Sequence, residues 1–133
     1  MNKDLEMEKA AMLIRARHAV KKVAVEFKTE LRTRVGEIEN ALLKGEIEKV
    51  VELSYNLEGE AATFGWPRVT RMCKWLRQIF TGDYDQKPDA EDILKVINAL
   101  KLMVTDPDNP NEERDEALFR EIYPMMSRAV SDI

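Results

Sequence analysis

The stretch SYNLEGEAATFGWPRVTRMCKWLR, residues 54–77, decides the fold because it describes two amphipathic helices joined by a sharp corner. Apolar residues recur every three or four positions on both sides of the corner, as on the buried face of a helix. Gly65 predicts the end of the first helix, and Pro67 suits the first turn of the second, where its missing N–H costs nothing. The predicted buried faces comprise Leu57, Ala61 and Phe64, then Val69, Met72, Cys73 and Leu76.

Residues 3–44, upstream of the corner, contain no proline and are predicted to be helical. Between residues 20 and 44 the apolar residues are always three or four apart, which keeps them on one face of a helix. These residues are Val20, Val23, Phe27, Leu31, Val35, Ile38 and Leu42. Residues 3–19 carry a weaker apolar face and either continue this helix or form a separate one after a kink. That weaker face consists of Leu5, Met12, Leu13 and Ala16.

Further helices are predicted over residues 46–64, 67–80, 90–104 and 112–131, separated by residues that interrupt helices. Gly45 suits a left-handed C-terminal position, and the polar loops are residues 81–88 and 105–111. Asp89 and Asn111 are predicted N-caps, and Pro124 is predicted to kink the last helix near Tyr123. Predicted inward residues are Ile47, Val50 and Val51, then Ile93, Val96, Ile97, Leu100 and Val104, then Ala117, Leu118, Ile122 and Met126.

The composition agrees with an all-α protein. The chain has 133 residues, 44% of them hydrophobic and 35% charged, with five glycines and five prolines, too few for a strand-rich fold with many turns. Helices joined by short loops lie antiparallel, so we expect an up-and-down antiparallel four-helix bundle. We expect one domain over residues 1–133. It would consist of an N-terminal helical extension (1–20), the bundle (21–104) and a C-terminal helix (112–131).

The corner resembles the core of the histidine-containing phosphotransfer (HPt) domain family, whose pattern is roughly A-H-x-L-K-G-x-A-x-x-x-G-x-x-x-L-x-x-x-C-x-x-L. The residues that match without a gap are Leu57, Gly59, Ala61, Gly65, Val69, Cys73 and Leu76. The resemblance covers roughly residues 23–80. It implies a four-helix bundle of phosphorelay signalling, with an exposed helix face onto which a receiver domain or histidine kinase docks.

Two positions depart from this pattern. Tyr55 stands in place of the phosphorylated histidine, and Glu58 stands in place of the lysine. A phenol is mostly protonated at neutral pH and is a poor phosphoryl acceptor, and a carboxylate opposes the incoming phosphoryl charge. We therefore expect a binding module that does not carry phosphate and has no catalytic residue. His18 is the only histidine and lies in the basic run RARHAVKK, where a solvated helix face is the simpler interpretation and phosphotransfer the weaker one.

The resemblance also indicates a partner-binding surface. Its predicted members are Glu52, Tyr55, Glu58, Gly59, Ala62 and Trp66. Gly59 either lets a partner backbone approach or relieves a crowded helix crossing, and Trp66 either covers the core or anchors a partner. A series of cations in the following helix faces either solvent or the acidic residues Glu58 and Glu60. These cations are Arg68, Arg71, Lys74 and Arg77.

Other classes of function find no support in the sequence. The net charge of −4 gives no argument for nucleic-acid binding, and no spacing of His, Cys and Asp suggests a metal or other cofactor. A single cysteine, the charged start MNKDLEMEK and the lack of a long apolar run lead us to expect a cytoplasmic protein without signal peptide or membrane contact. We expect no enzyme. The alternative is a helical interaction or oligomerisation protein unrelated to phosphorelay that uses its long N-terminal helix. A homodimer through the N-terminal helix is a separate expectation, in which Leu5, Met12 and Leu13 pack against a second copy of the chain.

Overall fold

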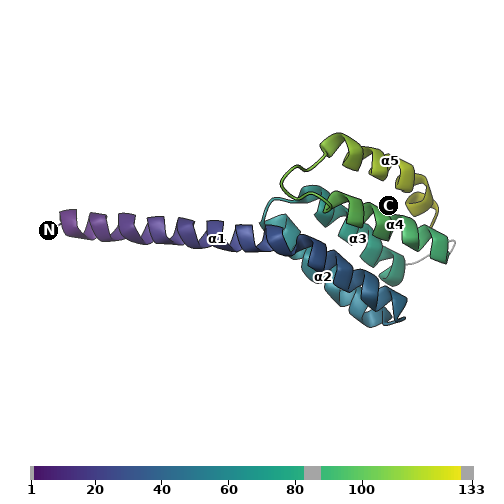
Figure 1. Ribbon diagram of the computed structural model, residues 1–133. Helices are drawn as coiled ribbons and strands as arrows, with labels where there is room; N and C mark the ends of the chain where they lie inside the picture. Colours follow the sequence, from purple (N-terminus) through teal and green to yellow (C-terminus); the bar gives the residue numbers. More distant parts are fainter. Residues whose placement is uncertain (1, 83–87, 130–133) are drawn as a thin grey trace. The chain divides into compact units, whose positions relative to one another are not determined.

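The computed structural model describes residues 2–82 and 88–129, which form five α-helices and no strand (Figure 1). The helices are α1 (Asn2–Leu43), α2 (Ile47–Thr63), α3 (Pro67–Thr81), α4 (Ala90–Met103) and α5 (Glu112–Ala129). The all-α class is confirmed, and the predicted helix ends agree with the observed ones to within a residue or two. Residues 83–87 of the predicted loop and residues 130–131 of the predicted last helix lie outside the described residues.

The chain divides into two units, residues 1–30 and residues 31–133, with the boundary inside α1. α1 is one helix over Asn2–Leu43, so residues 3–19 belong to the same helix as residues 20–43. Val20 is 62% exposed and Val23 is 46% exposed, so their predicted burial is wrong. Periodicity identifies the apolar side of a helix but does not say whether another element covers it.

The second unit is a helical bundle. Its helices pack in sequence order, α2 against α3 and α3 against α4, and α5 lies against both α3 and α4 (Figure 1). The large side chains with less than 2% exposure come from all five helices. Among them are Leu31, Ile38, Leu57, Met72, Leu76, Ile97, Leu100, Phe119 and Met126. The predicted core residues Leu57, Val69, Cys73, Leu76, Ile97 and Leu100 are confirmed as buried.

Several predicted inward residues lie elsewhere. Phe64 is only half-buried because it is the C-cap of α2, where the chain leaves the helical path. Ile47 is 41% exposed at the first position of α2. In α5 the buried face runs through Phe119, Ile122 and Met126, which leaves Ala117 exposed. Four others predicted inward are half-buried: Leu42, Val51, Ile93 and Leu118.

The corners and caps follow the predicted local chemistry. Gly45 and Gly65 have φ values of 70° and 84°, the left-handed conformation that ends a helix at low cost only for glycine. At the second corner the Trp66 backbone N–H donates to the carbonyl of Ala61 over 2.8 Å, which satisfies an end carbonyl of α2. The N-caps are confirmed, since the side chains of Asp89 and Asn111 accept backbone hydrogen bonds of 2.8 and 2.9 Å.

Pro124 lies inside α5, which continues to Ala129, so this proline does not end the helix. In residues 2–82 and 88–129, no helix is both long enough and apolar enough to cross a membrane.

Candidate functional site

The candidate site is an exposed face of α2, here called the Tyr55 face, formed by Glu52, Tyr55, Gly59 and Ala62. These residues are three or four apart on one helix and are all exposed, so the structure brings them together as the spacing predicts. Tyr55 is the most prominent of them, with 64% of its surface exposed. The opposite side of α2 is buried, so this face is fixed in place by the core behind it.

Glu58 lies beside the Tyr55 face and is held by Arg77 of α3. The Arg77 Nε and Nη2 atoms donate to the two Glu58 carboxylate oxygens over 3.2 and 3.3 Å, which makes the ion pair bidentate. The same guanidinium lies 5.6 Å from the centre of the Tyr55 ring. One cation therefore contacts both residues that depart from the family pattern, and its charge is balanced by a carboxylate.

Gly59 has no structural neighbour that would exclude a side chain. Apart from its chain neighbours and the backbone of its own helix, a Cβ atom placed on Gly59 meets no atom within 4 Å, and the residue is exposed. The interpretation that Gly59 relieves a crowded helix crossing is therefore wrong. A glycine inside a helix costs about 1 kcal/mol relative to alanine, and the bundle gains no packing in return.

Trp66 occupies a different place from the Tyr55 face. It is half-buried and is the N-cap of α3, where its carbonyl accepts hydrogen bonds from the Thr70 backbone and hydroxyl. Its side chain lines a small cavity of about 130 Å³ whose other walls include Met103, Pro107 and Pro110. None of the Tyr55-face residues lines this cavity.

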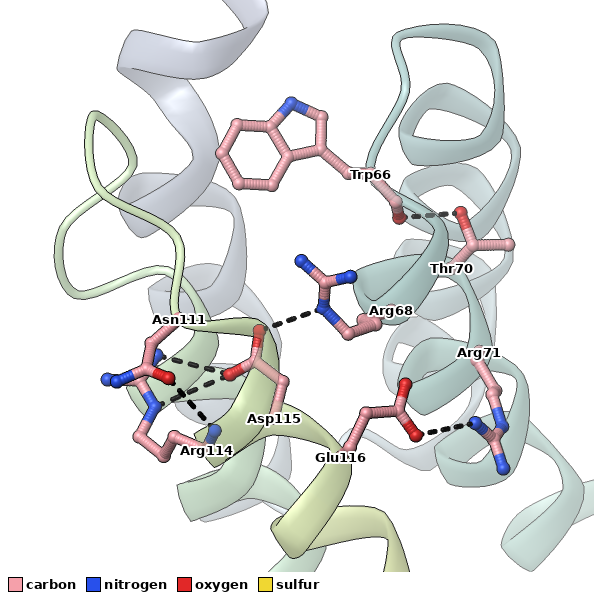
Figure 2. Close-up of polar contacts among 8 residues, drawn as sticks. All are labelled: Trp66, Arg68, Thr70, Arg71, Asn111, Arg114, Asp115 and Glu116. Carbon is pink, nitrogen blue, oxygen red and sulfur yellow. Dashed lines mark hydrogen bonds and ion pairs between the residues drawn. The ribbon is translucent and has the colours of Figure 1, made fainter.

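Near Trp66, a buried carboxylate joins α5 to the start of α3 (Figure 2). Asp115 is 3% exposed and accepts from Arg68 Nε at 3.2 Å and from Arg114 Nη2 at 3.1 Å. Arg71, one turn along α3, pairs with Glu116 at 3.7 Å. Two cations therefore surround one buried charge, which is the arrangement that makes such burial tolerable. The cluster holds the helices together and lies outside the Tyr55 face.

The cations of α3 thus have separate partners. Arg77 neutralises Glu58 as expected, but Glu60 pairs with Arg34 of α1 at 2.6 Å and with none of the α3 cations. Of the two alternatives for the cation series, pairing with Glu58 and Glu60 holds only for Arg77 and Glu58, while Arg68 and Arg71 pair with Asp115 and Glu116 of α5. Sequence reasoning missed the role of Asp115, because an acidic residue in the first turn of a helix is ordinarily solvated.

Cys73 and His18 take no part in the site. Cys73 is buried, which raises the pKa of its thiol, and the nearby Glu58 carboxylate raises it further. The thiol is therefore protonated and unreactive at neutral pH. His18 is exposed on α1. Across the described ranges, no three His, Cys, Asp or Glu side chains come together in a way that could hold a metal ion.

The geometry defines a helical bundle that presents one side of a central helix to solvent. A comparison with protein-family models matches residues 22–109 to the Hpt domain, more than half of the chain. The chain therefore belongs to the Hpt domain family, which works with receiver domains and histidine kinases in phosphorelay signalling. Comparison with curated proteins and with solved structures gave no match. The only histidine, His18, precedes the matched segment, so residues 22–109 contain none.

Proposed function

We propose that this Hpt domain binds a receiver domain or a histidine kinase through its Tyr55 face without accepting a phosphoryl group. The observation that carries the proposal is the absence of histidine from the matched residues 22–109. Tyr55 takes the place of the histidine in the family pattern and is exposed at the centre of the face. Such a protein catalyses no reaction and acts by binding alone, because it occupies the docking surface of its partner. The free Cys73 thiol suits a reducing cytoplasm.

The charges around Tyr55 support the loss of phosphotransfer. A phosphoryl group in transfer is stabilised by a nearby cation. Arg77 is the cation at the Tyr55 ring, and its guanidinium donates two hydrogen bonds to the Glu58 carboxylate. Glu52 adds a further exposed carboxylate one turn away. The local charge is therefore balanced or negative where a phosphate would need it positive.

The shape of the face supports retained docking. Gly59 and Ala62 leave the helix surface bare next to Tyr55, so a partner backbone can come close. Neither small residue is required by packing against the described part of the chain, because both are exposed. Docking accounts for a glycine that otherwise only lowers helix stability.

Binding is tested with arginine substitutions on matched positions. Gly59→Arg and Ala62→Arg place bulk on the Tyr55 face, and Ala117→Arg makes the same change on the exposed side of α5. Affinity for a panel of receiver and kinase domains is measured by calorimetry, with circular dichroism as the check on folding. We expect the first two changes to weaken binding at least about 100-fold and the third to leave it within about twofold. Equal effects of all three would contradict the assignment of the face.

Phosphotransfer is tested by incubation with a phosphorylated receiver, following acid-labile label. We expect no label on the wild type, and slow labelling of the double variant Tyr55→His with Glu58→Lys, which supplies an imidazole and removes the carboxylate from Arg77. Tyr55→His alone is the control and should label less, since Arg77 remains paired. Label on the wild type would contradict the proposal. A wild type that binds no receiver or kinase would favour the alternative, a helical interaction protein outside phosphorelay.

A further inference from the structure

Residues 2–30 of α1 carry an unusual amount of uncovered apolar surface. Eight large apolar side chains between residues 5 and 25 are 46% to 70% exposed. They are Leu5, Met7, Met12, Leu13, Ile14, Val20, Val23 and Val25. A helix of this kind owes most of its stability to packing of its apolar side. We therefore expect another molecule to cover this surface.

Most of these side chains lie on one side of the helix. Successive residues are rotated by about 100°, so a set spaced by three or four residues shares one side. The set, here called the Leu13 face, consists of Leu5, Met12, Leu13, Ala16, Val20 and Val23. The spacing continues to Phe27, which is buried. Met7, Ile14 and Val25 lie on the opposite side.

The charges beside the Leu13 face identify the occupant and its direction. Glu6 and Arg17 flank one edge of the face, and Glu8 and Arg15 flank the other. In the described residues none of these four makes an ion pair. An antiparallel pair brings each edge against the same edge of the second copy, so Glu6 meets Arg17 and Glu8 meets Arg15. A parallel pair joins opposite edges, and like charges would meet instead.

The apolar residues favour the same arrangement. When Met12 of one copy lies opposite Leu13 of the other in an antiparallel pair, Leu5 lies opposite Val20. In this register Lys9, the one charge within the face, lies opposite the small Ala16, where its aliphatic stem can pack. In a parallel pair Lys9 would face its own copy. We propose that two chains associate through the Leu13 faces of their N-terminal helices in this antiparallel register.

The first test compares neighbouring, equally exposed residues. Leu13 and Ile14 are both 53% exposed, but only Leu13 lies on the proposed interface. Sedimentation equilibrium of the full chain should give twice the 15.4 kDa monomer mass at about 10–100 µM. Leu13→Asp should weaken association at least about tenfold, and Ile14→Asp should leave it unchanged. A wild type that is monomeric throughout, or equal effects of both substitutions, would overturn the proposal.

The second test determines the direction. Leu5→Cys and Val20→Cys proteins are prepared separately, mixed and oxidised, with native Cys73 buried and therefore inert. The antiparallel register predicts a disulfide mainly between the two different variants. Disulfides formed only within each variant would overturn that register. As a check that avoids the apolar face, Glu6→Arg with Glu8→Arg should weaken association, and adding Arg15→Glu with Arg17→Glu should restore it. Failure of the restoration would overturn the charge pairing.

Discussion

The two faces of α2 differ in what constrains their residues, because one face is buried in the core and the other is exposed to solvent. The inner face consists of Val50, Ser54, Leu57 and Ala61, all with 2% exposure or less. The Tyr55 face lies on the same helix and is open to solvent. Burial constrains the volume and polarity of the inner side chains, whereas the exposed Tyr55 and Gly59 are under no such packing constraint. Residues that the fold does not need are the ones on which a partner can act.

The largest expected effect belongs to the inner face. Leu57 is 2% exposed at the centre of the core, and Leu57→Ala should lower the free energy of unfolding by about 2–5 kcal/mol, because it leaves a cavity. Denaturant unfolding measures this change. A midpoint within error of the wild type would mean that the inner face is not the core of the bundle.

Ser54 tests polarity on the same face. Its hydroxyl is buried and has no hydrogen-bond partner among the described residues, which is costly. Ser54→Ala removes the hydroxyl and suits a helix better, so we expect the free energy of unfolding to rise by about 1.5 kcal/mol. Thermal unfolding would show the increase. A decrease would indicate that the hydroxyl has a favourable contact and that this face is less apolar than described.

Gly59 tests the outer face. Because a Cβ at this position meets no atom within 4 Å outside its chain neighbours and its own helix backbone, Gly59→Ala should raise the free energy of unfolding by about 1 kcal/mol. Gly36→Ala in α1 is the matched control, since this helical glycine also has nothing within 4 Å of its Cβ position. We expect both changes to stabilise the fold, with a cost in partner binding only for Gly59→Ala. If Gly59→Ala instead destabilised the protein, this would indicate that Gly59 is required for packing.

The smallest expected effect concerns the ion pair at the edge of the outer face. Glu58 and Arg77 retain 16% and 26% side-chain exposure, and Glu58→Gln should cost about 0.5 kcal/mol of stability or less. The informative measurement is the salt dependence of unfolding, which should weaken when the pair is lost. A loss near that of Leu57→Ala would show that this pair is as structural as the cluster around Asp115.

Local chemistry in the sequence predicted most of the fold. Glycines at 45 and 65 and the caps Asp89 and Asn111 act on their own neighbours, so their effects can be predicted without knowing the packing. Contacts between helices could not be predicted in this way. The Arg68–Asp115 pair joins residues 47 positions apart, and its existence depends on how α5 lies on α3. Periodicity within either helix carries no such information.

The candidate site shows the same division. Spacing placed Glu52, Tyr55, Gly59 and Ala62 on one exposed face, which the structure confirms. The sequence offers a series of cations in the following helix as possible ion-pair partners of Glu58. Which of them forms the pair depends on how the helices pack, and in the structure it is Arg77. The resemblance predicts Trp66 as part of the partner-binding surface, yet Trp66 lines the cavity beside Pro107 and Pro110. A change of direction at a corner separates residues that are adjacent along the chain.

The Gly65 corner also bears on how quickly the bundle folds. Its closing hydrogen bond joins Trp66 to Ala61, and the α2 and α3 helices that it connects pack directly on each other. Contacts between residues close in the chain need little loop-closure entropy, and proteins rich in them fold fast. The α2–α3 hairpin is thus suited to form in the rate-limiting step of folding. In that case substitution of Gly65 would slow the folding rate constant more than it speeds unfolding.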